Sequence, residues 1–198
     1  LVATILGLTL TTASVVAQGF DVNSFAAEFD LPAGGIQQRV LVGDIDGDGK
    51  PDLVTPNATG NSVSVYRNVS VSGSLSSNSF GARVDFPISG SSYGGALADV
   101  DGDGKLDIVA GINNGGSGTV VSVLRNTSSS GVINSNSFAA AVNFTTAQGP
   151  VHVAAADLDG DGRTDLAVAA FQGGVVSILR NTSSAGVIDA TSFAAKVD

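Results

Sequence analysis

Asp44-Ile-Asp-Gly-Asp-Gly-Lys-Pro-Asp52 is the first of three acidic, glycine-punctuated stretches that dominate this chain. Asp99-Val-Asp-Gly-Asp-Gly-Lys-Leu-Asp107 and Asp157-Leu-Asp-Gly-Asp-Gly-Arg-Thr-Asp165 repeat it with the same spacing. Together the three stretches hold twelve of the 17 aspartates. Four carboxylates within nine residues repel one another at neutral pH, and a hard cation that receives their oxygens removes that cost. The stretches therefore predict metal-binding loops.

Each loop offers ligands for one ion: the side chains at positions 1, 3, 5 and 9 and the backbone carbonyl at position 7. Glycines at positions 4 and 6 permit the tight turns with positive φ between them. The predicted ligands are Asp44, Asp46, Asp48, Asp52 and the Lys50 carbonyl; Asp99, Asp101, Asp103, Asp107 and the Lys105 carbonyl; and Asp157, Asp159, Asp161, Asp165 and the Arg163 carbonyl. All-oxygen ligation by a flexible loop favours calcium over the stricter octahedron of magnesium and over zinc. We expect three calcium ions, one per loop.

An EF-hand or dockerin-like loop begins with the same spacing but differs at position 12. An EF-hand places a bidentate glutamate there, whereas this chain has Thr55, Ala110 and Val168. The residues that follow predict β-strand and not an amphipathic helix. Solvated acidic turns that bind no ion are the other alternative, which the glycine-only spacing and the threefold recurrence disfavour.

The rest of the chain repeats in register with the loops. Phe25, Phe80, Phe138 and Phe193 recur at intervals close to 56 residues, and an Arg-Asn pair follows each loop, at 67–68, 125–126 and 180–181. Each period predicts four strands, which in the second repeat are about 94–99, 106–112, 119–125 and 138–144. The short apolar segment before each loop predicts a first strand buried on both faces.

Four-stranded antiparallel units in tandem predict an all-β fold, a β-propeller. The three predicted blades span about 37–86, 94–144 and 151–198. Because a ring typically needs four to eight blades, the three blades predict a fragment of a larger ring.

The sequence resembles the FG-GAP/VCBS repeat family, the integrin-alpha-type propeller repeats that also occur in many secreted bacterial proteins. The resemblance covers Ser24 to Asp198 and rests on the DxDGDGxxDL/I loops, the VSVxRN or VSILRN strands and the phenylalanine-initiated strands. The literal Phe-Gly-Gly-Ala-Pro string is absent, and Phe80-Gly81-Ala82 is the nearest approach. The resemblance implies a ring of seven blades that binds ligands on the face opposite the calcium loops.

The segment Leu1–Ala17 is apolar and uncharged, with Val15 and Ala17 at positions that suit signal-peptidase cleavage. We interpret it as the tail of a truncated secretory signal, so that 18–198 is the mature, secreted or cell-surface part. Residues 25–30 are then expected to form an outer strand that completes the final blade. A strand hairpin from an earlier repeat is the alternative, and a membrane span is disfavoured because only Leu1–Leu10 is densely apolar.

Composition limits the classes of partner. The net charge is −9, and no basic stripe is present, which argues against nucleic acid and anionic membranes as partners. We also expect no membrane insertion of the mature part. Cysteine is absent, so no disulfide braces the fold. An extracellular protein or glycan is the expected ligand.

Catalytic chemistry has little support in a chain with one histidine, one glutamate and no cysteine, so no enzyme is predicted. The loops opposite the acidic ones differ between repeats, as recognition loops do. Candidate ligand-contacting residues on them are Arg39, Tyr93, Gln148, His152 and Phe171. The first hypothesis is an adhesion or ligand-binding module. The alternatives are an accessory or rim domain of an extracellular polysaccharide- or lipid-acting enzyme, and a spacer with no ligand of its own.

Overall fold

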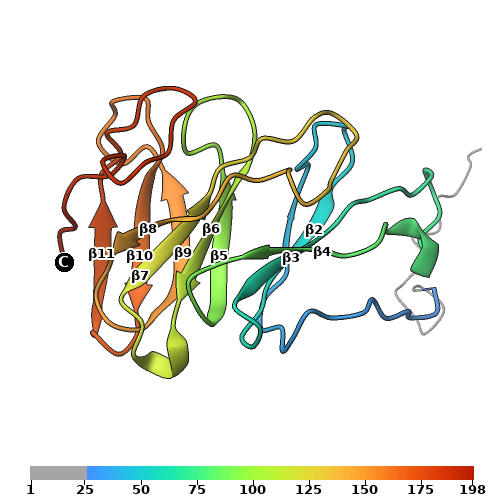
Figure 1. The fold of residues 1–198 in the computed structure, drawn as a ribbon, viewed down its shortest axis with the longest axis horizontal. Helices are drawn as coiled ribbons and strands as arrows, with labels where there is room; N and C mark the ends of the chain where they lie inside the picture. The colour runs from blue at the N-terminus through green and yellow to red at the C-terminus, as the bar shows by residue number, and fades with distance from the viewer. Residues whose placement is uncertain (1–25) are drawn as a thin grey trace, which may run out of the picture.

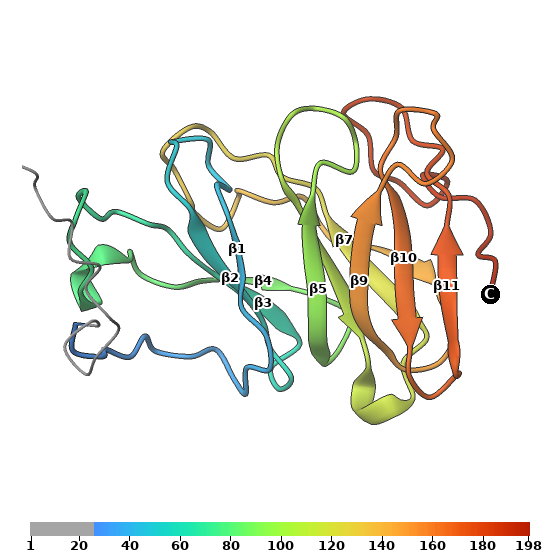
Figure 2. The same ribbon diagram turned by 180° about the vertical axis from the view of Figure 1, so that it is seen from behind.

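The structure, a computed structural model, describes residues 26–198, which form an all-β fold of three blades packed side by side (Figures 1 and 2). The signal-peptide prediction for 1–17 lies outside the described residues. Blade 1 contains β1 (Leu41–Gly43), β2 (Asp52–Pro56), β3 (Ser62–Tyr66) and β4 (Val84–Pro87). Blade 2 contains β5 (Ser92–Ala98), β6 (Asp107–Ile112), β7 (Val120–Leu124) and β8 (Val142–Thr145). Blade 3 contains β9 (Pro150–Ala156), β10 (Asp165–Ala170) and β11 (Val175–Leu179).

Every paired strand is antiparallel to its neighbour, and the strands of each blade follow one another in chain order. The fourth strand position of blade 3 is held by an isolated bridge between Ile178 and Val197, with N–H···O distances of 2.7 and 3.0 Å. Two single-turn 3-10 helices, Ser77–Ser79 and Asn114–Gly116, lie in connecting loops. This confirms the predicted all-β fold of four-stranded antiparallel blades.

The blades pack through apolar side chains that alternate along their strands. Val54, Val63 and Val65 of blade 1 meet Ile108 and Leu124 of blade 2 in one buried cluster. A second cluster joins blades 2 and 3 with the same spacing of residues. Each cluster contains one edge-to-face aromatic pair with centroids 4.8 Å apart, Phe86–Phe138 in the first and Phe144–Phe193 in the second. The repeated phenylalanines therefore join neighbouring blades.

The first strands depart from the prediction of burial on both faces. Val42 of β1 is 61% exposed, and β9 alternates between buried and exposed residues. A first strand pairs with only one strand of its own blade, so its remaining cover comes from neighbouring blades. β5 receives that cover from β9, and the first strands of the two outer blades are more open.

Two further predictions were wrong in detail. The strand predicted to begin at Phe138 begins at Val142, because Phe138 makes only a single bridge to Asn126 and turns its ring into the cluster between blades. Residues 26–33 contain no strand; the Tyr66 hydroxyl donates instead to the Pro32 carbonyl at 2.8 Å. Phe25 lies outside the described residues.

Gly94 lies where β5 and β9, the first strands of blades 2 and 3, approach each other closely. A β-carbon there would lie 2.2 Å from the carbonyl oxygen of Val151 in β9, which leaves no room for any side chain. We expect Gly94→Ala to destabilise the fold by about 1–3 kcal/mol through overpacking of backbone against backbone. Urea denaturation followed by circular dichroism measures the loss.

Gly81→Ala is the matched control for that substitution. The nearest atom to a β-carbon at Gly81 lies 3.7 Å away, which is an ordinary contact, and its φ is not positive. A change within about 0.5 kcal/mol is expected for such a site. Equal losses at Gly94 and Gly81 would contradict the close approach of β5 and β9.

Candidate metal centres

Each acidic loop connects the first and second strands of a blade, and the three loops lie at the same end of the molecule (Figure 1). We call residues 44–52 loop 1, 99–107 loop 2 and 157–165 loop 3. The glycines at positions 4 and 6 of every loop have positive φ, from 66° at Gly47 to 87° at Gly104. This left-handed backbone brings the aspartates around a common centre.

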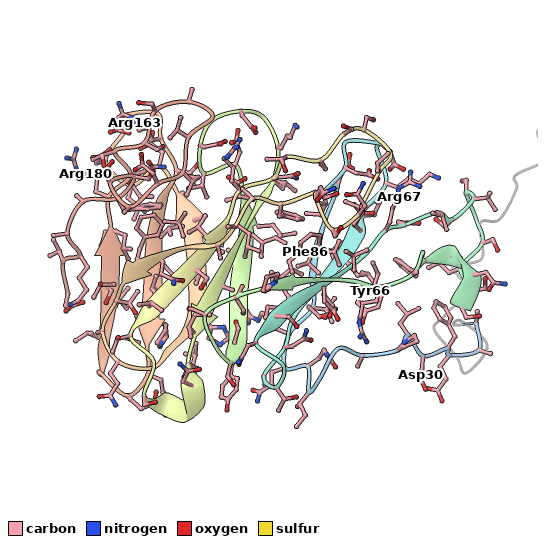
Figure 3. All side chains as sticks on the ribbon, viewed as in Figure 1. Asp30, Tyr66, Arg67, Phe86, Arg163 and Arg180 are labelled. Carbon is pink, nitrogen blue, oxygen red and sulfur yellow. The ribbon has the colours of Figure 1, made fainter. Side chains whose placement is uncertain are left out.

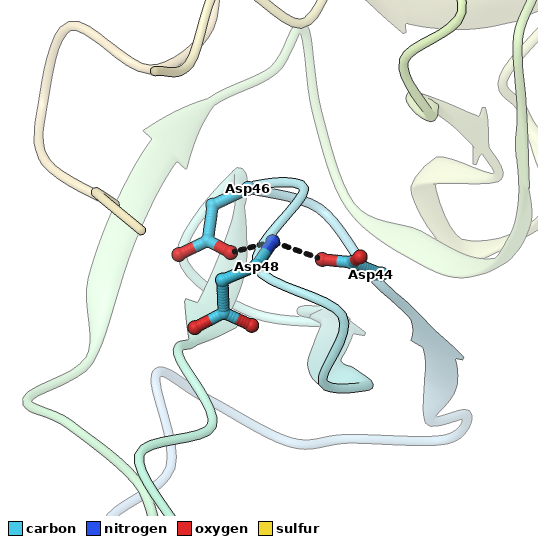
Figure 4. Close-up of side chains that lie close together, drawn as sticks. All are labelled: Asp44, Asp46 and Asp48. Carbon is cyan, nitrogen blue, oxygen red and sulfur yellow. Dashed lines mark hydrogen bonds between the residues drawn. The ribbon is translucent and has the colours of Figure 1, made fainter. Parts of the chain in front are cut away.

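The backbone of loop 1 is folded around its own carboxylates. The Asp48 amide donates to Asp44 Oδ1 at 3.1 Å and to Asp46 Oδ1 at 3.2 Å, as Figure 4 shows. The Gly49 amide donates to Asp44 Oδ2 at 2.9 Å, and the Lys50 amide donates to Asp48 Oδ1 at 3.0 Å. Loops 2 and 3 repeat these four bonds at distances of 2.9–3.2 Å.

The structure brings three carboxylates of each loop together. In every group one oxygen of each residue lies within 4.8 Å of the others: Asp44, Asp46 and Asp48; Asp99, Asp101 and Asp107; and Asp157, Asp159 and Asp165. The loops thus differ in whether position 5 or position 9 joins positions 1 and 3. All three clusters could hold a metal ion. The carbonyls of Lys50, Lys105 and Arg163 and the remaining aspartates stay predicted ligands.

The aspartate at position 9 also connects the loop to its blade. Asp107 is fully buried and accepts from the amide of Val100 at 2.9 Å and from that of Asn126 at 2.8 Å. Asp52 and Asp165 make the equivalent pairs of bonds. Burial raises the pKa of Asp107 to about 7, and burial likewise raises the pKa of Asp52. A nearby cation would stabilise the ionised form of these carboxyls.

The arginine of each repeated Arg-Asn pair faces an acidic loop. The sequence analysis assigned no role to these arginines. Arg67 forms salt bridges to Asp46 at 2.5 Å and Asp48 at 2.7 Å. Arg125 and Arg180 lie 4.0 and 3.8 Å from the position-3 carboxylates of loops 2 and 3. Figure 3 shows Arg67 and Arg180, with Arg163, at this same end of the molecule. Each arginine offsets part of the negative charge of its loop.

Asp101 supplies the observation that tests the fit to a cation. Its side chain is fully buried, and its Oδ2 atom has no hydrogen-bond partner among the described residues, because the facing Arg125 Nη1 lies 4.0 Å away, beyond hydrogen-bond distance. Burial, followed by repulsion from Asp103, raises its pKa. Buried carboxylate oxygens are normally paired or coordinate a metal. The oxygen-only donor set and this orphaned atom both fit a hard cation.

The asparagine of each Arg-Asn pair is a second residue that sequence reasoning did not assign. The Asn126 side-chain amide donates to the Ile45 carbonyl of loop 1 and to the Leu106 carbonyl of loop 2. Asn181 makes the equivalent bonds to Val100 and Thr164. Asn126 and Asn181 therefore each connect the acidic loops of two neighbouring blades, whereas Asn68 donates only to the Pro51 carbonyl of its own loop. Only the recurrence of the pair could have indicated such a role.

The candidate ligand-contacting residues lie at or near the other end of the blades. His152 and Phe171 line one shallow hollow with Val151, Val175 and Val176. Phe171 is 75% exposed and Gln148 is exposed, whereas Arg39 and Tyr93 are half-buried. The structure therefore brings two of the five together, in a largely apolar setting. Among residues 26–198, no helix is long and apolar enough to cross a membrane.

Comparison with known proteins gives one match. The family model of the FG-GAP-like repeat matches residues 44–110 and 111–168, which together make up more than half of the chain and include all three acidic loops. The searches of curated proteins and of solved structures find no match.

Proposed function

Because the chain belongs to the FG-GAP-like repeat family, we propose that it is a calcium-stabilised extracellular module whose ligand-binding face lies opposite the ions. Repeats of this family are typically extracellular and non-catalytic. The observation that carries the proposal is the threefold recurrence of one loop geometry, with carboxylate oxygens within 4.8 Å of one another in each loop.

Calcium is the ion that the donor set suits best. Every donor is an oxygen, which excludes the soft ligands typical of structural zinc. The loops lie at a surface and are glycine-rich, so they can adjust to the irregular coordination that calcium accepts and magnesium does not. Extracellular modules typically bind calcium with dissociation constants of about 0.1–1 mM, which matches calcium levels outside cells. An exported protein would therefore carry its ions.

The proposed ligand-binding face is a continuous rim of loops. The Ser91 hydroxyl donates to the Ala58 carbonyl at 2.7 Å and joins the loops of blades 1 and 2. The Gly149 amide donates to the Gly118 carbonyl at 2.7 Å and joins blades 2 and 3. Loops held by hydrogen bonds of this kind present their side chains in fixed positions, which lowers the ordering cost of binding.

Binding is better supported than catalysis at this rim. His152 is the one ionisable side chain lining its hollow, and the other lining residues are alanine, valine, glycine and Phe171. A general base needs a second polar group to orient it or to stabilise developing charge. An exposed aromatic ring beside an imidazole is instead suited to contact a protein or a sugar ring. The adhesion or ligand-binding hypothesis is therefore preferred to the enzyme alternative.

Surface plasmon resonance tests this proposal on the immobilised chain, with a panel of extracellular matrix proteins and glycans in calcium and in chelator. We expect at least one ligand that binds in calcium and loses about tenfold or more in affinity with Phe171→Ala, as an aromatic hot spot would. Leu75→Ala is the matched control, because Leu75 is a large apolar side chain that is 65% exposed in the connection between β3 and β4, away from the hollow that Phe171 lines. An equal loss of affinity in both variants would overturn the proposed binding face. So would an affinity that Phe171→Ala leaves unchanged.

A further inference from the structure

One segment of each following blade lies across the acidic loop of the blade before it. We call residues 126–132 strap A; in Figures 1 and 2 it reaches from blade 2 to the loop end of blade 1. Ser128 Oγ donates to the Ile45 carbonyl at 3.1 Å, and Ser130 Oγ donates to the Gly47 carbonyl at 3.1 Å. The Gly131 amide donates to the Asp46 carbonyl at 3.2 Å. Strap A thereby holds three consecutive carbonyls of loop 1.

Strap B, residues 181–187, lies on loop 2 in the same way. The Ser183 hydroxyl donates to the Val100 carbonyl at 3.4 Å, and the Gly186 amide donates to the Asp101 carbonyl at 2.9 Å. Ala185 occupies the position that Ser130 has in strap A, so strap B has no hydroxyl group for the third contact.

The straps cover buried carboxylates. The side chains of Asp46 and Asp101, at position 3 of loops 1 and 2, are fully buried. The two straps differ in the number of contacts that they make, because strap A adds the Ser130 hydroxyl to the contacts that both straps share.

We propose that the straps are positioning elements for the ions, so that a docked strap raises the calcium affinity of the loop beneath it. The proposal rests on the calcium assignment made above. A docked strap fixes the backbone between the first and third ligands before the ion arrives, so less conformational entropy is lost on binding. By thermodynamic linkage, an ion in loop 1 then strengthens the docking of blade 2 on blade 1 to the same degree.

Glycine amides give a separate readout for each loop. Loops 1, 2 and 3 carry Gly47 and Gly49, Gly102 and Gly104, and Gly160 and Gly162. In the chain labelled with 15N-glycine, calcium titration followed by heteronuclear NMR yields one isotherm per loop. Loop 1, whose strap makes the additional Ser130 contact, gives the isotherm that a strap variant should change, and loops 2 and 3 give the internal references.

A double variant, Ser128→Ala with Ser130→Ala, removes two strap contacts without touching a carboxylate. Its calcium affinity is expected to fall about fivefold at loop 1 and to stay unchanged at loops 2 and 3. Ser70→Ala with Ser72→Ala is the matched control, since these serines hold the same positions in blade 1 and no loop lies under them in residues 26–198. An unchanged loop 1 isotherm in the first variant would contradict the role of the strap.

The same titration separates the two proposals. If no glycine of any loop shifts with calcium, the calcium assignment itself fails. If the glycines shift but the strap variant leaves the loop 1 isotherm unchanged, calcium binds and the strap proposal alone fails. The spread of amide signals reports whether each variant is folded.

Discussion

Calcium is expected to raise the midpoint of thermal unfolding by about 10 °C between excess chelator and about 5 mM free ion. An ion that binds only the folded state stabilises it by RT ln(1 + [L]/Kd). With a dissociation constant of about 0.5 mM, each loop contributes about 1.4 kcal/mol, and three loops contribute about 4 kcal/mol. For a chain of this size, about 1 kcal/mol shifts the midpoint by roughly 2–4 °C.

Differential scanning calorimetry measures that shift, and magnesium at the same concentration is its control. Magnesium dehydrates reluctantly and demands octahedral geometry, so its effect should be a small fraction of that of calcium. An equal rise with magnesium would indicate general relief of the repulsion among the acidic loops. A folded chain whose midpoint does not move with either ion would remove the metal assignment.

The sequence was sufficient to predict the blades and the acidic loops. The loop conformation is a local property, because the aspartates at positions 1, 3 and 5 and the glycines at positions 4 and 6 all lie within nine residues. The observed loops accordingly show the predicted positive φ at both glycines and bring three carboxylates together in each case. Recurrence at a constant period then located the strands on either side of each loop.

Contacts between distant residues could not be predicted in this way. Arg67 meets Asp46 across 21 residues of sequence, and Asn126 meets Ile45 across 81. The Arg-Asn pair was visible as a repeated feature, but nothing in its spacing showed that the arginine faces its own loop while the asparagine reaches the loop of the preceding blade. Such contacts depend on how the blades twist and stack.

Burial of the first strands was overestimated for a related reason. A run of small apolar residues indicates that a strand is covered but does not say by which element. β5 is covered because β9 packs beside it, and the backbone contact at Gly94 shows how closely. Val42 of β1 has the same kind of sequence and remains exposed. The sequence pattern predicts that a strand forms and where it lies in its blade. The burial of a first strand depends also on whether a neighbouring blade packs against it.

Asp107→Asn is expected to destabilise the fold in calcium by about 2–4 kcal/mol, because buried donors lose a charged acceptor. Both oxygens of Asp107 are committed, one to the amide of Val100 and the other to that of Asn126. An asparagine can accept only one of these bonds and places its NH2 group against the second amide. The lost stability has two contributions: one buried amide is left without an acceptor, and the ion site in loop 2 is weakened.

Chemical denaturation in calcium and in chelator separates those two contributions. In chelator only the hydrogen bonds are lost, so the destabilisation should be smaller by about 1.4 kcal/mol, the share of one ion at 5 mM calcium. Asp85→Asn is the matched control: Asp85 accepts from Ser64 at 2.6 Å, and the equivalent Asn143 accepts from Ser122 at the same distance. That substitution keeps the acceptor for Ser64 and removes the charge only from a part-exposed ion pair with Arg83, so it should cost less than about 1 kcal/mol in either condition. If Asp107→Asn costs the same with and without calcium, Asp107 connects loop 2 to blade 2 but does not bind the ion, and the ligands of that loop must come from Asp99, Asp101, Asp103 and the Lys105 carbonyl.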